Sequence, residues 1–163
     1  MRRILVISLV AAALSASLLS AQSRPFIQGA WRLVEITISG PNTSINSKPQ
    51  PALYLFTARH YSIIRVTSAN ARPQFKDPTK VTEAEALAIW GPLQAQSGTY
   101  EITGENLNLL PTVAKNPQRM RAGMKADVFT FALQGENLTL VQKFAGDGQP
   151  TANLMTVKLT RAE

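Results

Sequence analysis

The sequence predicts an all-β fold, an eight-stranded antiparallel up-and-down barrel, on three observations. The chain of 163 residues has the length of one domain. After residue 23 it consists mainly of short stretches rich in β-branched and aromatic residues. Turn-forming residues such as Gly104-Glu105 and Gly146-Asp147-Gly148 separate these stretches. Consecutive strands with short turns favour an antiparallel meander, and eight strands can close around one small ligand.

The predicted strands follow one another along the chain with one long interruption. They cover residues 30–38, 53–57, 60–67, 99–103, 106–110, 127–133, 138–144 and 154–161.

One short helix is predicted in the connection between the third and fourth strands. Thr82 and Glu85 have the spacing of a capping box, and Gly91-Pro92 ends the helix after Trp90. Connections as long as residues 68–97 often form lids or binding loops. The alternative is a helix that closes one end of the barrel with Leu87 and Trp90.

Residues 1–23 have the pattern of a secretory signal peptide. Two arginines precede an uncharged stretch, and small residues follow it. Cleavage is predicted after Ala21 or after Ser23, which leaves residues 24–163 as the barrel domain. The uncharged stretch of about 16 residues is shorter than the roughly 20 that span a bilayer, so no integral membrane span is expected after processing. We therefore expect an exported protein, either periplasmic or secreted.

Composition narrows the function classes. The chain has no cysteine, which excludes disulfides, thiolate metal sites and cysteine nucleophiles, and its single histidine, His60, cannot form a multi-histidine metal site. No phosphate-binding loop is present, so we expect no cofactor and no metal. The net charge of +7 favours anionic partners, and nucleic acid is the least expected of these for an exported protein.

The start of the first predicted strand, Gly29-Ala30-Trp31, resembles the G-x-W signature of lipocalins. Segments that follow in matching order are Leu55-Phe56-Thr57, Tyr61-Ser62, Arg72-Pro73 and Gly98-Thr99-Tyr100. Together they resemble the bacterial lipocalin-like domain family over most of residues 27–144. The resemblance implies a lipocalin-type barrel in which Trp31 closes one end and an arginine of the last strand packs across it. Arg161 matches that arginine.

Strand parity supports the same position for Arg161. It lies on the more apolar face of its strand, in alternation with Val157 and Leu159. An arginine on that face needs a partner, and the Trp31 ring would supply a cation–π platform. The alternative is a solvated side chain at a frayed chain end.

Candidate ligand-binding residues come from the apolar alternation of the predicted strands, because a small-molecule site is mostly apolar with a few polar groups. The aromatic candidates are Tyr54, Phe56, Tyr61, Tyr100, Phe129 and Phe131. The same residues would also fill a barrel without a cavity, and the sequence leaves both interpretations open. Candidate polar groups inside the barrel, each alternatively a solvated strand residue, are Glu35, Arg65, Asp127 and Gln142.

The connection over residues 111–126 is cationic. Lys115, Arg119, Arg121 and Lys125 occur there without a carboxylate, together with two methionines. Such a segment could form a rim suited to an anionic amphiphile, and Arg119 and Arg121 are therefore added to the candidate ligand-binding residues. The alternative is a solvated loop.

The favoured function is non-catalytic binding of a small hydrophobic or amphipathic molecule, with an anionic one suggested by the cationic connection. The dispersed carboxylates and the unpartnered His60 offer no catalytic residues. An enzyme of the isomerase or cyclase type is the first alternative, since some lipocalin-like barrels have such activity. A filled barrel that binds a macromolecule through its basic surface is the second. The sequence leaves the oligomeric state open.

Overall fold

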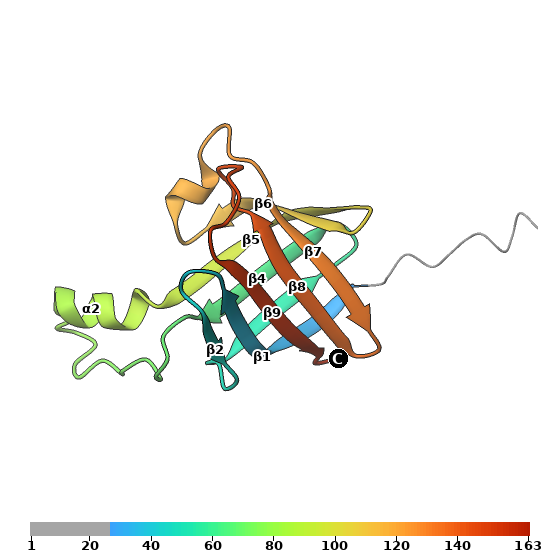
Figure 1. Ribbon diagram of the computed structural model, residues 1–163. Helices are drawn as coiled ribbons and strands as arrows, with labels where there is room; N and C mark the ends of the chain where they lie inside the picture. Colours follow the sequence, from blue (N-terminus) through green and yellow to red (C-terminus); the bar gives the residue numbers. More distant parts are fainter. Residues whose placement is uncertain (1–26) are drawn as a thin grey trace, which may run out of the picture.

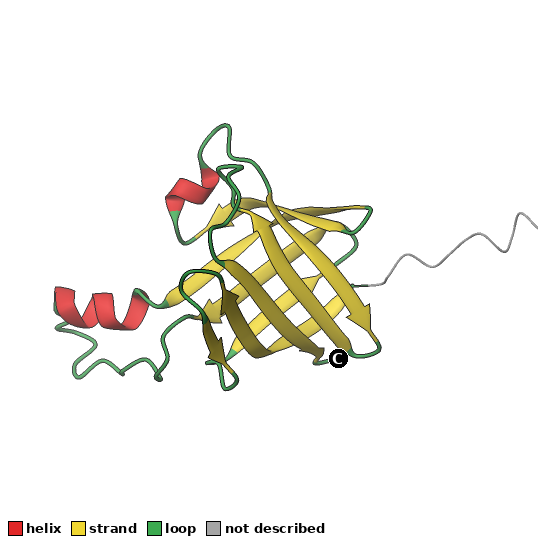
Figure 2. Ribbon diagram, viewed as in Figure 1, coloured by secondary structure: helices red, strands yellow, loops and turns green. Residues whose placement is uncertain are grey.

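A computed structural model describes residues 27–163, so the predicted signal peptide and its cleavage positions lie outside the described residues. The strands are β1 (Gly29–Ser39), β2 (Ser44–Asn46), β3 (Ala52–Phe56), β4 (His60–Val66), β5 (Leu93–Thr103), β6 (Asn106–Ala114), β7 (Asp127–Gln134), β8 (Asn137–Phe144) and β9 (Leu154–Arg161) (Figure 1). The helices are α2 (Glu83–Trp90) and the 3-10 helix η1 (Pro117–Met120) (Figure 2).

The strands form a closed antiparallel barrel. The sheet runs in the order β2-β1-β3-β4-β5-β6-β7-β8-β9, and β1 also pairs with β9 along most of its length. Eight strands make the ring, while the short β2 pairs only with residues 36–38 of β1. The predicted eight-stranded up-and-down barrel is therefore confirmed.

The predicted place of the helix in the strand order is wrong. Helix α2 follows the fourth strand, β4, and not the third. The cause is β2, which was not predicted because its three residues, two of them polar, are too few to show an alternating pattern. The capping box itself is present: the Thr82 hydroxyl accepts a hydrogen bond from the Glu85 N–H at 3.3 Å, and the Glu85 carboxylate accepts one from the Thr82 N–H at 3.1 Å.

The two ends of the barrel differ in their connections. At one end, which we call the floor, the strands are joined by the short turns at residues 57–59, 104–105 and 135–136. At the other end, which we call the mouth, all the connections are long: residues 40–51, 67–92, 115–126 and 145–153. The described chain begins and ends at the floor, where β1 starts and β9 stops (Figure 1).

The floor is packed with apolar side chains around Trp31. This ring is fully buried, and its Nε1–H donates to the carbonyl oxygen of Ile27 at 2.8 Å. The guanidinium carbon of Arg161 lies 4.3 Å from the centre of the ring, which confirms the predicted contact. Gly29 makes room for it, because a Cβ atom there would lie 2.6 Å from the Arg161 guanidinium and the glycine has a φ of +128°. Fully buried neighbours are Leu107, Leu138 and Leu159.

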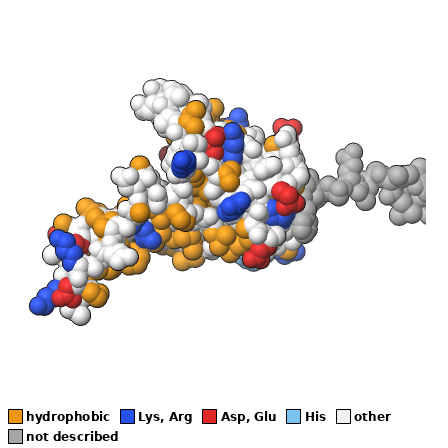
Figure 3. All heavy atoms as spheres, turned by 90° about the horizontal axis from the view of Figure 1, so that it is seen from below, with side chains coloured by type: hydrophobic (Ala, Val, Ile, Leu, Met, Phe, Trp, Pro, Cys, Tyr) orange, Lys and Arg blue, Asp and Glu red, His pale blue; other side chains and the backbone are white. Residues whose placement is uncertain are grey.

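Helix α2 sits on an arm that projects from the mouth end of the barrel (Figures 1 and 2). Leu87 is 71% exposed and Trp90 is 51% exposed, so the alternative in which these side chains close the barrel is wrong. Figure 3 shows hydrophobic side chains on this arm and on the adjoining surface of the barrel. Within residues 27–163, no helix has the length and hydropathy that a bilayer crossing requires.

Candidate ligand-binding cavity

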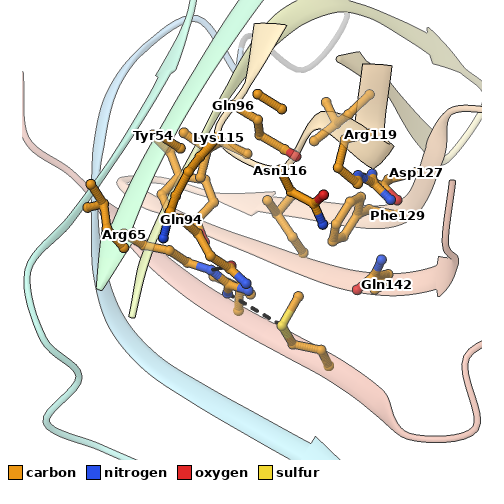
Figure 4. Close-up of a pocket in the computed structure, with 18 of the residues that line it drawn as sticks. Tyr54, Arg65, Gln94, Gln96, Lys115, Asn116, Arg119, Asp127, Phe129 and Gln142 are labelled. Carbon is orange, nitrogen blue, oxygen red and sulfur yellow. Dashed lines mark hydrogen bonds and ion pairs between the residues drawn. The ribbon is translucent and has the colours of Figure 1, made fainter. Parts of the chain in front are cut away.

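The barrel is hollow between its mouth and its floor. The cavity has a volume of about 520 Å³, within the usual range of small-molecule sites (Figure 4). Seven of the eight ring strands contribute to its wall, and residues of the mouth connections complete it. The larger apolar side chains of this wall are Tyr54, Ile63, Leu93, Leu109, Phe129, Leu140, Met155 and Val157. A bound molecule could therefore bury an apolar portion against the inner surface of the sheet.

Strand geometry explains why these residues face inward. Tyr54 of β3 is opposite Ile63 of β4, and Leu140 of β8 is opposite Val157 of β9. Side chains of directly opposite residues lie on the same face of a sheet, so each pair points into the barrel together. Burial raises the pKa of the Tyr54 hydroxyl, and the positive charge of Arg65 partly opposes this effect.

Arg65 is the first polar feature of the cavity. Its Nε–H donates to the Gln94 side-chain oxygen at 2.7 Å, and its Nη1 lies 3.5 Å from the sulfur of Met155. Because Arg65 belongs to β4 and Met155 to β9, which are not neighbours in the ring, this side chain crosses the lumen (Figure 4). Among residues 27–163, no carboxylate forms an ion pair with Arg65.

Arg119 and Asp127 form the second polar feature. Arg119 lies in η1, where the Asn116 side chain caps the helix by accepting from the Gln118 N–H at 3.0 Å. The Arg119 guanidinium donates to Oδ2 of Asp127 in an ion pair (Figure 4). Asp127 is only 4% exposed. Its burial raises the pKa of the carboxyl group, although Arg119 acts in the opposite direction.

Lys115 connects the cavity wall to the arm. Its ammonium group donates to the carbonyl oxygens of Trp90 and Gly91, the latter at 3.1 Å. These carbonyls lie at the C-terminal end of α2, where a positive charge is favourable. Lys115 therefore lines the cavity while its charge is directed toward the end of the helix.

The predicted ligand-binding residues divide into two groups. Tyr54, Phe129 and Arg119 line the cavity. The side chains that do not line it are Phe56, Tyr61, Tyr100, Phe131 and Arg121. The position of a residue relative to the cavity does not test whether it contacts a ligand, so a binding role for any of the eight residues stays a prediction.

The residues outside the cavity wall have other surroundings. Phe56 and Tyr100 form an edge-to-face pair with ring centres 5.4 Å apart, and the Tyr100 hydroxyl donates to the carbonyl of Thr57 in a floor turn at 2.7 Å. Tyr61 is buried, Phe131 packs against the core and Arg121 is exposed. The alternating pattern identified inward faces but not the depth of each residue in the barrel.

Of the four polar candidates, Arg65, Asp127 and Gln142 line the cavity, and Glu35 does not. A bulge in β1 between Leu33 and Glu35 shifts the alternation, and Glu35 pairs instead with Lys158 at 2.7 Å. Lys158 holds the pKa of the Glu35 carboxyl below its usual value.

Three polar wall residues were not predicted: Gln94, Gln96 and Asn116. The two glutamines belong to β5, which starts at Leu93, whereas the sequence predicted a strand from residue 99. The sequence did contain a pattern that could have identified both glutamines: every second residue before Tyr100, counted back through Gly98, lies on the same face of the strand and leads to Gln96 and Gln94. Asn116 had no strand pattern, because it lies in the connection before η1.

No family model matches this sequence, and no curated protein does either. Among solved structures, the chain is similar to a lipocalin-like protein from Bacteroides uniformis ATCC 8492, with 14% sequence identity and a TM-score of 0.45. The match covers 83% of this chain and 97% of that one. At this level of similarity, the fold is assigned from the closed barrel of the chain itself.

Proposed function

We propose that this chain binds a small amphipathic molecule with an anionic group in the open half of its barrel and does not catalyse a reaction. The observation that carries the proposal is Arg65, a guanidinium without a carboxylate partner among the described residues that crosses a cavity with a partly apolar wall. The packed floor and the hollow mouth also argue against the filled-barrel alternative.

The three cations of the cavity wall differ in what they can offer an anion. Arg119 is neutralised by Asp127, and Lys115 donates to helix carbonyls. Arg65 has neutral partners among the described residues: Gln94, Met155 and the Tyr54 hydroxyl. A hydrogen bond to a charged group contributes about 1.5–3 kcal/mol, and each buried methylene group adds about 0.8 kcal/mol. An anionic head group at Arg65 with an apolar tail against the inner wall uses both contributions.

A fluorescence-displacement titration with decanoate and decanol tests this proposal. Wild type is expected to bind decanoate at least about tenfold more tightly than decanol, or about 1.4 kcal/mol. Arg65→Gln should remove this preference while decanol binding persists, because burial of the tail does not depend on the charge. The matched control is Arg121→Gln, which removes an exposed cation outside the cavity and should leave the preference intact.

Two outcomes would contradict the proposal in different ways. Equal affinity of wild type for the acid and the alcohol would remove the anionic group from the proposed ligand. Absence of binding by either probe would mean that the cavity does not accept an amphiphile of this class.

We propose in addition that the protein is exported, to the periplasm or to the outside of the cell, after removal of residues 1–23. The basic start, the uncharged stretch and the small residues that follow it support this proposal. N-terminal sequencing of the exported protein should begin at Gln22 or Arg24. Recovery of a chain that starts at Met1 from a membrane fraction would contradict it.

A further inference from the structure

The cavity is shallow between Arg65 and the floor. On four of the ring strands it is lined by two successive inward-facing positions, which lie two residues or about 7 Å apart along the strand. These pairs are Ile63 and Arg65 on β4, Asp127 and Phe129 on β7, Leu140 and Gln142 on β8, and Met155 and Val157 on β9. Because the strands of a barrel are tilted, the depth along its axis is smaller than this distance.

The next inward-facing position toward the floor is occupied by side chains on the same four strands. The residues there are Tyr61, Phe131, Leu138 and Leu159, and none of them lines the cavity. Three of the four are at most 2% exposed, and Phe131 packs against the core. A molecule held at Arg65 therefore meets a closed layer of side chains a short distance below it. An extended alkyl chain cannot continue toward the floor.

Two aromatic side chains line the cavity on opposite walls. Tyr54 belongs to β3 and Phe129 to β7, which are four strands apart in either direction around the eight-stranded ring (Figure 4). The Tyr54 hydroxyl also forms a hydrogen bond with Arg65. An apolar group attached to an anion at Arg65 would therefore lie beside Tyr54. Aromatic rings pack favourably with one another in offset-stacked or edge-to-face arrangements.

We propose that the apolar part of the ligand is a compact ring system and not an extended alkyl chain. This inference rests on the proposed function and makes it more specific: the ligand is a ring-bearing anion whose charged group contacts Arg65. The filled layer beneath the cavity limits the length of the apolar part. The volume of about 520 Å³ leaves room for its width, and the two aromatic side chains offer contacts to a ring.

The probes are 2-naphthoate and undecanoate, which have the same number of carbons and one carboxylate each. In the displacement titration, wild type is expected to bind 2-naphthoate at least about tenfold more tightly than undecanoate. The reason is that each methylene group left outside the cavity forfeits about fourfold in affinity.

A pair of phenylalanines on β7 provides matched variants. Phe129 and Phe131 lie on the same face of the strand, but only Phe129 lines the cavity. Phe129→Leu should reduce the preference for 2-naphthoate by about threefold to tenfold, because it replaces a ring contact by an aliphatic one. Phe131→Leu is the control and should leave the preference unchanged. Thermal melting of both variants shows whether the barrel is folded.

A chain-length series in wild type tests the depth without any substitution. Affinity for straight-chain alkanoates should rise by about fourfold for each methylene group among the shortest members and level off before undecanoate. An undiminished rise through undecanoate would show that the cavity accepts an extended chain, and this would overturn the inference.

The other outcomes separate this inference from the proposed function. If undecanoate binds as tightly as 2-naphthoate, the ring system is refuted and the proposed function stands. Equal losses of preference in Phe129→Leu and Phe131→Leu would refute the contact between the ring and the cavity wall, and the inference with it. If neither probe nor any alkanoate binds, the proposed function fails together with the inference.

Discussion

The floor and the mouth of this barrel are formed by the same eight ring strands and differ in almost everything else. Strands are joined at the floor by turns of two or three residues, and at the mouth by connections that contain a strand, an α-helix and a 3-10 helix. The floor surrounds Trp31 with fully buried leucines. The mouth half of the lumen instead contains arginines, glutamines and a carboxylate.

This difference separates the parts of the chain that close the barrel from those that can vary its chemistry. Burial of apolar surface at the floor does not require a particular ligand, so the closure of the barrel can be maintained there. Long surface connections tolerate substitution because few packing contacts depend on them. The connections at the mouth, which supply Lys115, Asn116 and Arg119, can therefore change without loss of the fold.

The two tryptophans of the chain test this separation most strongly, because one lies at each end. Trp31→Ala should lower the free energy of unfolding by about 3–5 kcal/mol, since it removes a fully buried ring. Trp90→Ala, the matched control on the arm, should change it by less than about 0.5 kcal/mol. Urea unfolding followed by circular dichroism measures both. Similar losses for the two variants would remove the distinction between the ends.

A smaller effect is expected from the contact between Arg161 and Trp31. A double-mutant cycle with Arg161→Ala and Trp31→Ala should give a coupling energy of about 0.5–2 kcal/mol, the range of cation–π pairs. Arg161 also donates to the carbonyl of Gln28 at 2.9 Å and pairs with Glu136 at 3.2 Å, so its single substitution reports more than the ring contact. Additive effects in the cycle would show that the ring contact contributes nothing.

At the mouth, Thr82→Ala removes the N-cap of α2. Such substitutions cost about 1 kcal/mol in the stability of a helix. The loss should appear as faster hydrogen exchange of the amides of α2, with the urea midpoint of the barrel unchanged, because the arm projects from the barrel. Thr103→Ala, at the end of β5, is an exposed control that leaves the cap intact. A lowered midpoint for Thr82→Ala alone would mean that the arm and the barrel unfold together.

The smallest effect concerns pH at the same cap. Hydrogen bonds from the backbone and the hydroxyl of Thr82 lower the pKa of Glu85 below 4.5. Its contribution to the helix is therefore fully present above pH 4.5 and is lost as the pH falls through the lowered pKa. Hydrogen exchange of α2 in wild type should approach that of Glu85→Gln in this acid range. A constant difference between the two proteins from pH 2 to pH 6 would contradict it.

Sequence reasoning was most successful at the floor. The resemblance implied the position of Arg161 over Trp31 and alternation supported it, and the prediction was correct because β9 has no bulge and Arg161 is opposite Trp31. The stretches of strand-forming residues were also long enough to predict all eight ring strands. The three residues of β2 were too few for a period, and this displaced α2 in the predicted order.

The mouth was harder to predict for two physical reasons. Alternation shows which face a residue occupies but not its depth along the barrel axis, so Phe56 and Tyr61 could not be separated from Tyr54. Bulges also reverse the alternation within a strand, as β1 does before Glu35. The connections have no repeating sequence pattern, so the sequence does not show which residues they bring together. Arg119 could therefore be predicted as a candidate ligand-binding residue, but its ion pair with Asp127 could not be predicted.

The packed floor also has a kinetic consequence. A molecule held in the lumen cannot be pushed out from behind, because Trp31, Leu107 and Leu138 occupy the space beneath it. One occupant must leave before the next can enter, so the rate of exchange should be set by spontaneous dissociation and should not rise with the concentration of competitor. An amphiphile whose head group contacts Arg65 would enter tail first and leave head first. Any acceptor that receives it would therefore meet the charged end before the apolar one.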